Sequence, residues 1–214
     1  MNGAPGPAGR KGIVYQTLLL GGAAALAAAL LLAGNQLTRS AIAERQAEDL
    51  RHSLAQVLPP SLHDNNLLED IVVLTEATGE SLTVYRATVG GRTTGYAYRT
   101  RGQGFSGTIE IIMGIDPHGE VLGARVLTHA ETPGLGDKIE VEKSDWITHF
   151  TGHSLVNTSP SQWGVKKDGG QFDQFSGATV TPRAVVKAVH QGLLLFERHR
   201  DELANSDPST SEQP

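Results

Sequence analysis

The stretch Asp173-Gln174-Phe175-Ser176-Gly177-Ala178-Thr179, followed directly by Val180-Thr181-Pro182, decides how the C-terminal part of the chain folds. Thr181 is a good helix N-cap, and Pro182 suits the first helical position, where its missing N–H costs nothing. Thr179 is therefore expected just outside a helix N-terminus, where free backbone donors and the helix dipole favour a phosphate. Gly177 lets the chain approach a bulky ligand closely. The pattern predicts a phosphate-bearing ligand at Thr179 or, more simply, a turn that leads into a capped helix.

The residues on either side of this stretch predict an α+β fold of antiparallel β meanders with packed helices. Turn signals such as Gly90-Gly91 and Pro117-His118-Gly119 separate β-rich runs at hairpin distances, which favours antiparallel pairing. Five strands are expected, at residues 71–75, 81–88, 93–100, 107–115 and 121–129. Helices are expected at 144–151, with Ser144 as a possible cap, and at 182–199, where an apolar stripe has helical spacing.

The N-terminal part of the chain predicts one membrane crossing. Residues 13–33 are almost wholly apolar, and about 21 helical residues span about 30 Å, the thickness of a bilayer core. Arg10 and Lys11 precede this segment, so the positive-inside tendency places the N-terminus in the cytoplasm and the remaining mass outside. A cleaved signal peptide is the alternative, with Ala41-Ile42-Ala43 as its cleavage pattern.

These patterns divide the chain into five parts. We expect a disordered cytoplasmic tail at 1–12, a transmembrane helix at 13–33, a helical stalk or a helix packed on the domain at 34–60, an exported domain at 61–200 and a disordered tail at 201–214. Pro59-Pro60 ends the stalk helix.

Composition excludes several classes of function. The chain has 214 residues, a net charge of −5 and no cysteine. Its scattered Lys and Arg form no basic stripe, so no nucleic acid is expected as a partner. Without cysteine this chain holds no thiolate-ligated iron–sulfur cluster and no c-type haem, so an electron carrier here needs an organic cofactor. His149 and His153 have ligand-like spacing, but Gly152 weakens the helix between them, and no metal site is predicted.

Two glycine-containing loops lie between the strands and the Thr179 stretch. Residues 102–107 spell the dinucleotide pattern G-x-G-x-x-G, but a strand follows where a nucleotide-binding unit needs a helix, so a hairpin loop is expected. Residues 129–138 read His-Ala-Glu-Thr-Pro-Gly-Leu-Gly-Asp-Lys. Their two glycines around Leu135 let the backbone approach a flat ligand, although a Pro-Gly pair alone is more often only a turn.

The order and spacing of the two motifs resemble the family of FMN-binding domains that includes the G subunit of the Rnf electron-transport complex and the C subunit of the sodium-pumping NADH:quinone reductase. In that family, an Asp-x-x-Ser/Thr-Gly-Ala-Thr motif carries FMN through a phosphoester to its last threonine. The run at 166–175, Lys-Lys-Asp-Gly-Gly-Gln-Phe-Asp-Gln-Phe, and the run Thr181-Pro182-Arg183 favour the Rnf protein over the pump protein.

The resemblance implies one covalent FMN per chain, attached to Thr179, with Asp173 as part of the flavinylation motif. It implies no catalytic residue and no metal in this chain. The residues implied to contact the flavin are Glu131, Thr132, Leu135, Gly136, Ser176, Gly177 and Ala178.

Physical roles follow for some of these residues. Backbone N–H groups of the Leu135-Gly136 loop would bond the carbonyls of the flavin ring, and Leu135 would cover one face. Trp146 is expected in the core, with ring stacking as the alternative. Lys166 or Lys167 either balances the phosphate charge or is an exposed loop lysine.

The implied function is a redox subunit that relays electrons one at a time through FMN on the periplasmic face of the bacterial inner membrane. Its implied partners are other membrane subunits of a complex that couples NADH and ferredoxin chemistry to ion transport, the lipid bilayer, and a separate flavin transferase. The chain is not expected to catalyse a reaction alone. A noncatalytic assembly protein, the C subunit of a sodium pump and a free-standing flavin reductase are the alternatives.

Overall fold

The computed structural model describes residues 7–75 and 79–206, and the chain divides into two compact units at Asp49/Leu50. Helix α1 runs without interruption over Pro7–Val57 and ends just before Pro59-Pro60, as expected. Its segment Tyr15–Leu32 has a mean hydropathy of 1.7 and is long and apolar enough to cross a membrane. The helix begins at Pro7, within the range 1–12 expected as a tail, and residues 1–6 lie outside the described part.

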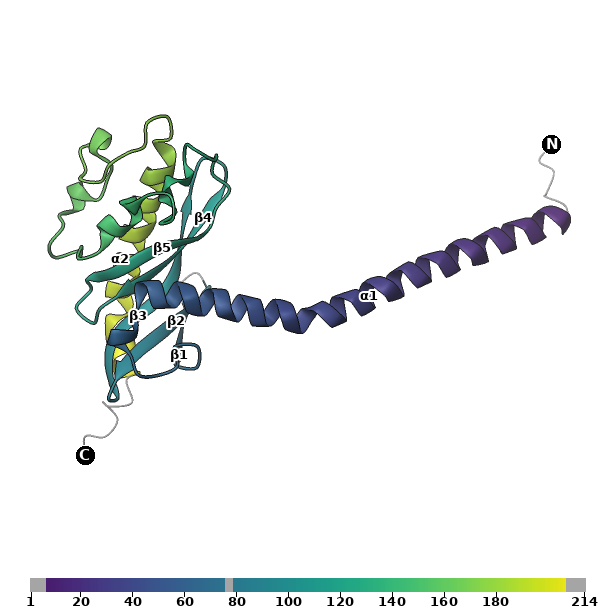
Figure 1. Ribbon diagram of the computed structural model, residues 1–214, viewed down its shortest axis with the longest axis horizontal. Coiled ribbons are helices and arrows are strands. Elements are labelled where there is room, and N and C mark those ends of the chain that lie inside the picture. The colour runs from purple at the N-terminus through teal and green to yellow at the C-terminus, as the bar shows by residue number, and fades with distance from the viewer. Residues whose placement is uncertain (1–6, 76–78, 207–214) are drawn as a thin grey trace. The chain divides into compact units, whose positions relative to one another are not determined.

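The second unit contains a five-stranded antiparallel sheet in the order β1-β2-β3-β4-β5, which confirms the predicted α+β meander (Figure 1). The strands are β1 (Ile71–Thr75), β2 (Ser81–Val89), β3 (Arg92–Gln103), β4 (Thr108–Ile115) and β5 (Val121–Thr128). Gly90 and Gly91 turn β2 into β3 with φ values of 56° and 79°, a conformation that glycine adopts at no steric cost.

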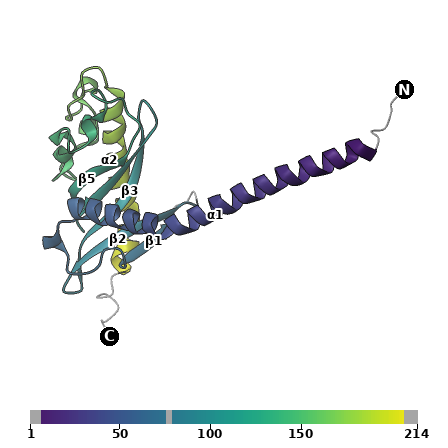
Figure 2. The same cartoon turned by 45° about the vertical axis from the view of Figure 1, so that its right-hand side comes forward.

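Helix α2 (Val180–Asn205) covers one face of this sheet (Figures 1 and 2). Its apolar stripe is buried against strand residues of the same core, and the Tyr98 hydroxyl donates to the Gly192 carbonyl at 2.7 Å. Burial of Tyr98 raises the pKa of its phenol well above the ordinary value. The apolar pattern of the last helix therefore did predict the face that meets the sheet.

The other face of the sheet holds a smaller core formed with the last turns of α1 (Figure 2). Leu54, Val57 and Leu58 are fully buried there, together with Ala97 and Ile112 from the alternate positions of β3 and β4. The compact unit starts at Leu50 for this reason, so a domain boundary at residue 61 leaves out side chains that belong to its core.

Short 3-10 helices fill the connection between β5 and α2: η2 (Asp137–Ile139), η3 (Asp145–Phe150), η4 (Pro160–Gln162) and η5 (Lys166–Asp168). The helix expected at 144–151 forms as η3, and the Ser144 hydroxyl accepts from the Trp146 N–H, which confirms the cap. Trp146 is a core residue, as favoured, because it is buried and packs edge-on against Phe150 and Phe175.

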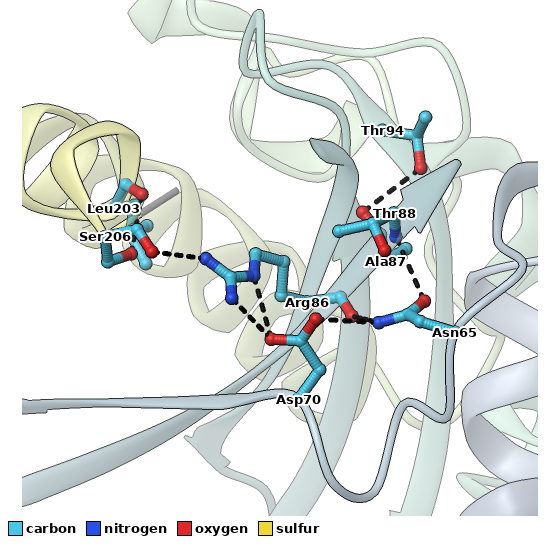
Figure 3. Close-up of polar contacts among 8 residues, drawn as sticks. All are labelled: Asn65, Asp70, Arg86, Ala87, Thr88, Thr94, Leu203 and Ser206. Atoms are coloured by element: carbon cyan, nitrogen blue, oxygen red, sulfur yellow. Dashed lines mark hydrogen bonds and ion pairs between the residues drawn. The ribbon is translucent and has the colours of Figure 1, made fainter. Parts of the chain in front are cut away.

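A polar cluster closes the C-terminal end of α2 (Figure 3). The buried Arg86 guanidinium pairs with Asp70 at 2.7 Å and donates to the carbonyl of Ser206 at 2.5 Å. Asn65 donates to the Arg86 carbonyl and accepts from the Thr88 N–H, so the segment before β1 joins the same cluster. The tail predicted to be disordered from 201 is helical as far as Asn205; residues 207–214 lie outside the described part.

Candidate functional site

The start of α2 differs from the sequence prediction. The helix begins at Val180 with Thr179 as its N-cap residue, so Thr181 is not the cap. The Thr181 hydroxyl instead donates to the carboxylate of Glu131, far away in the sequence. Pro182 still lies in the first turn, where backbone N–H groups have no partner within the helix, so its missing donor costs nothing there.

The attachment motif forms a tight turn that presents Thr179. Ala178 N–H donates to the Phe175 carbonyl at 3.2 Å, and Gly177 has a φ of 82°. A Cβ at Gly177 would lie 3.5 Å from the Leu135 side chain, which shows that the two motifs are neighbours in space. Ser176 and Gly177 are exposed, and Thr179 is half-buried. The turn thus places a threonine hydroxyl next to an open helix N-terminus.

The N–H groups of Val180 and Thr181 have no acceptor among the described residues. Helix geometry leaves the first N–H groups of α2 without intrahelical partners. The first N–H group of the helix that donates to a backbone carbonyl is that of Arg183, which donates to the Thr179 carbonyl. Such donors, together with the positive end of the helix dipole, bind phosphate groups. The residues present therefore fit the phosphate of an FMN joined to Thr179.

The loop between β5 and η2 is closed by its own hydrogen bonds. The N–H groups of Leu135 and Gly136 both donate to the Thr132 carbonyl at 3.1 Å. Both N–H groups thus have an acceptor within the loop, and their bonds to the carbonyls of a flavin ring stay a prediction. Leu135 keeps 45% of its surface exposed beside Gly177, so its role as an apolar cover stays a prediction.

Glu131 lies beneath the surface of the site. The residue is only 5% exposed. One carboxylate oxygen accepts from the Ser106 N–H at 2.9 Å, and the other accepts from the Thr181 hydroxyl. Both oxygens are thus engaged by the protein, so Glu131 joins three segments of the site. The sequence had implied a flavin contact for this residue.

The G-x-G-x-x-G stretch is a hairpin loop, as expected. Strand β3 continues to Gln103, and Gly104 N–H donates to the Gly107 carbonyl at 2.8 Å. Close packing explains the glycines at positions 102 and 104. A Cβ at Gly102 would lie 2.6 Å from the Ala184 carbonyl, and one at Gly104 would lie 2.4 Å from the Glu131 carboxylate.

Ion pairs that the sequence analysis missed surround the attachment turn. The Lys166 ammonium forms an ion pair with the carboxylate of Asp173 at 2.7 Å, so the charge of this lysine is paired with the aspartate of the motif. Asp168 accepts two hydrogen bonds from the Arg183 guanidinium, at 2.6 and 2.9 Å, and this contact lowers the pKa of Asp168. Asp173 lies in the motif, and the other three residues lie in the runs on either side of it, so the opposite charges in these runs were the available signal.

A second charged group supports the neighbouring loop. A backbone hydrogen bond from Gly134 and the Lys143 ammonium lower the pKa of Asp137. Lys143 also lowers the pKa of Glu140, whose Oε1 lies 2.8 Å from Nε2 of His129. Among residues 7–75 and 79–206 no group of three or more His, Cys, Asp or Glu side chains could hold a metal ion. His153 is instead within hydrogen-bond distance of Thr158.

Comparison with known proteins places both motifs in one domain. Residues 104–194 match the family model of the FMN-binding domain, and the matched range contains the Glu131 loop and the Thr179 turn. The second unit is therefore an FMN-binding domain, and the chain also carries an apolar helix near its N-terminus.

Similar proteins narrow this class. The chain is 53% identical over 186 residues to the G subunit of the ion-translocating oxidoreductase complex of Cereibacter sphaeroides, and the match covers 87% of this chain and 85% of that protein. It is 46% identical over 198 residues to the protein of the same name from Stutzerimonas stutzeri, with 92% and 87% covered. The chain belongs to the family of G subunits of ion-translocating oxidoreductase complexes.

Two solved structures show weaker similarity. The NqrC protein of Shewanella oneidensis is 21% identical, and the match covers 67% of this chain and 76% of that one, with a TM-score of 0.48. The C subunit of the Na⁺-translocating NADH-quinone reductase of Parabacteroides distasonis is 24% identical, with 64% and 68% covered and a TM-score of 0.46.

Proposed function

We propose that this chain relays electrons through one FMN joined by a phosphoester to the hydroxyl oxygen of Thr179. The observation that carries this proposal is the position of Thr179. It is the N-cap residue of α2, half-buried at the end of a tight turn, and two N–H groups without described acceptors follow it. Membership of the G-subunit family and the FMN-binding domain support the same conclusion.

The chain receives the cofactor and does not attach it. No hydrogen bond is described for the Thr179 hydroxyl, so no described side chain acts as its general base, and an unassisted threonine is a weak nucleophile. A separate transferase therefore supplies the activation. In the attachment step the Thr179 oxygen bonds to the FMN phosphorus of FAD, the phosphoanhydride bond breaks, AMP leaves, and the hydroxyl proton is released.

Asp173 belongs to this maturation step rather than to electron transfer. Its carboxylate is exposed and paired with Lys166, and its backbone carbonyl accepts from the Trp146 indole at 2.8 Å. The buried tryptophan thus holds the backbone of the motif while the carboxylate remains accessible to the transferase. A carboxylate next to a phosphate suits a magnesium ion held between them during transfer.

Bound FMN supplies one-electron chemistry, and the chain binds and positions it. The helix N-terminus holds the phosphate, and Leu135 beside Gly177 offers apolar surface to the ring. Covalent attachment prevents the loss of FMN from an exported domain by dissociation and dilution. The relatives are named as subunits of a complex, which supports the proposal that other subunits donate electrons to this chain and accept them from it.

The apolar helix anchors the chain in the bacterial inner membrane in this proposal. Arg10 and Lys11 precede the apolar segment, which favours a cytoplasmic N-terminus and a periplasmic FMN-binding domain. Labelling of single cysteines introduced on either side of the segment, at Asn2 and at Gln162, tests this orientation. A membrane-impermeant reagent applied to spheroplasts should label only the second.

Electron transfer through the assembled complex tests the proposed relay. Thr179→Val keeps the shape of the side chain and removes the hydroxyl, whereas Thr179→Ser keeps an attachment oxygen. The valine variant should assemble with the other subunits and lose electron transfer, and the serine variant should retain covalent flavin and part of the turnover. Unchanged turnover in the valine complex would show that this chain acts only in assembly.

A further inference from the structure

Strands β2 and β3 pair over only part of their length. Their ladder begins at the pair Val84 and Tyr98 and runs from there toward the Gly90-Gly91 turn. Beyond Tyr98, residues 99–103 of β3 pair with β4 alone, and residues 81–83 of β2 pair with β1 alone. The backbone edges that these two stretches turn toward each other therefore lack a partner strand among the described residues, and such an edge is a template for another strand.

Two cavities occupy this opening of the sheet, with volumes of about 480 and 640 Å³. They adjoin each other, because they share the lining residues Glu80, Arg99, Thr100, Arg101 and Leu195. Residues 81–83 of β2 complete the first cavity, and residues of α2 complete the second. We call the opening between residues 81–83 and 99–101 the strand gap.

The unpaired edge of β3 has a fixed backbone. Strand β4 pairs with it on its other side. The Thr100 hydroxyl donates to the Ala188 carbonyl of α2 at 3.0 Å, and a Cβ at Gly102 would lie 2.6 Å from the Ala184 carbonyl. Contacts with β4 and α2 thus hold this edge in place without β2. A strand that adds to it does not have to order it first, which favours binding.

The strand gap is basic, although the chain has a net charge of −5. Arg99, Arg101 and Arg198 line it, whereas Glu80 is the one acidic residue among its described lining. Arg99 and Arg101 share a single carboxylate, that of Glu110, at 3.6 and 3.3 Å. Within residues 7–75 and 79–206, no ion pair is described for Arg198. This surplus of positive charge favours an occupant that carries acidic side chains.

We propose that the strand gap is a docking site for an extended, acidic segment of another subunit of the complex, which adds as a strand to the unpaired edge of β3. In strand addition, backbone hydrogen bonds give affinity and pockets for alternate side chains give specificity. The relatives are named as subunits of a complex. The proposal goes beyond the electron relay and does not depend on FMN at Thr179.

The two faces of β3 offer different surfaces to such a segment. Thr100 bonds to α2, so Arg99 and Arg101 point to the opposite face of the sheet, because successive side chains of a strand alternate. Leu195 lines both cavities, and Leu194, which lines the larger one, is 44% exposed. A segment with alternating acidic and apolar side chains therefore matches the strand gap on both faces.

Hydrogen exchange followed by mass spectrometry tests the docking site, on the full-length chain in detergent and on the purified complex. In the chain alone, residues 99–103 should exchange faster than residues 96–98, which pair with strands on both sides. In the complex, exchange at 99–103 should slow by about tenfold or more, because N–H groups that face the gap become bonded. Unchanged exchange at 99–103 would overturn the inference, and so would slower exchange only in β1, whose outer edge is also unpaired in the sheet.

Charge reversal tests the arginines. The double variant Arg101→Glu, Arg198→Glu should lower recovery of the chain with the tagged complex by about tenfold, because like charges then face each other. Arg92→Glu is the matched control, since Arg92 is an exposed arginine at the other end of β3; its recovery should equal that of the native chain. Equal recovery of the double variant and the control would contradict the acidic partner.

Exchange in the absence of other subunits identifies the alternative occupants. The chain alone is placed in vesicles of phosphatidylcholine, with and without phosphatidylglycerol, and is also measured in detergent over a range of concentrations. Slow exchange at 99–103 that requires phosphatidylglycerol would assign the arginines to a membrane surface, and slow exchange that requires high concentration would assign the gap to a second copy. Either result would overturn the inference. The complex with Thr179→Val should show native protection, which separates this test from that of FMN attachment.

Discussion

The two ends of α2 are held by buried side chains of opposite charge, but only one end is closed. At the C-terminal end, the Arg86 guanidinium donates to the Ser206 carbonyl. At the N-terminal end, the Glu131 carboxylate accepts from the Thr181 hydroxyl. Each charge matches the sign that the helix dipole favours at its end, positive beside the last carbonyls and negative beside the first turn.

The surroundings of the two ends differ. Arg86 has Asp70 as an ion-pair partner, and Leu203 beside it is 1% exposed. No ion pair is described for Glu131 within residues 7–75 and 79–206. Instead, the exposed side chains of Leu135 and Val180 lie near Glu131, and the first N–H groups of α2 have no acceptor in the described part of the chain. The comparison indicates that the Arg86 end serves stability, whereas the Glu131 end is left open for a ligand.

The largest effect on stability is expected at the closed end. Arg86→Met leaves Asp70 and the Ser206 carbonyl without their cation, so the free energy of unfolding should fall by about 3 kcal/mol, as for other broken buried ion pairs. Urea unfolding followed by circular dichroism measures this. Arg99→Met is the control, because Arg99 is half exposed and its guanidinium lies 3.6 Å from the Glu110 carboxylate. Such surface pairs contribute about 0–1 kcal/mol to the free energy of unfolding.

Flavinylation of Arg86→Met sharpens the comparison. The folded fraction of this variant should accept FMN as the native chain does, because the attachment turn lies at the other end of α2. A variant that is stable but poorly flavinylated would contradict the separation of the two ends.

A smaller effect is expected where β3 approaches the first turns of α2. Gly102→Ala places a Cβ 2.6 Å from the Ala184 carbonyl, and overpacking of this kind costs about 1–3 kcal/mol. Gly164→Ala is the control, because its Cβ would meet only ordinary contacts at 3.7 Å. Thermal unfolding of the two variants compares them directly. Equal midpoints would show that the helix can move away from β3 at little cost.

The smallest effect concerns the exposed pair at the open end. The Arg183 guanidinium lowers the pKa of Asp168 in the folded state, so the pair contributes stability above the ordinary pKa of an unfolded aspartate. That contribution is lost as the pH falls through the lower, folded-state pKa. The exposure of both side chains keeps it small.

Carboxyl NMR titration measures this pKa. Asp168 should titrate below the ordinary range in the native chain, and Arg183→Gln should return its pKa toward that range. If the pKa of Asp168 is the same in Arg183→Gln as in the native chain, the Arg183 guanidinium does not form this ion pair in solution.

Local sequence patterns predicted the strands and the motif turn because their causes are local. Glycines at the Gly90-Gly91 turn and the alternation of apolar residues define the meander, and Gly177 defines the turn before Thr179. The helix start was misassigned for the opposite reason. The Thr181 hydroxyl bonds to Glu131, 50 residues earlier, and no local pattern reveals such a partner.

The loop around Leu135 differs, because its hydrogen-bond partner is local. The sequence did not show that the Thr132 carbonyl, three and four residues earlier, accepts from both N–H groups of the loop. The extent of the compact unit was likewise underestimated, because the burial of Leu54 and Val57 depends on a sheet that follows them in the chain. Partners that are distant in sequence thus account for the misassigned helix start and for the underestimated extent of the compact unit.

Intact mass and in-gel flavin fluorescence after denaturation test the central claim most directly. The native chain and Thr179→Val would each be coexpressed with a flavin transferase. The account predicts fluorescence, and a mass increase of one FMN less water, in the native chain only. Their absence from both proteins would contradict the account and leave the open end of α2 as a capped turn, and their presence in both would place the attachment at another residue.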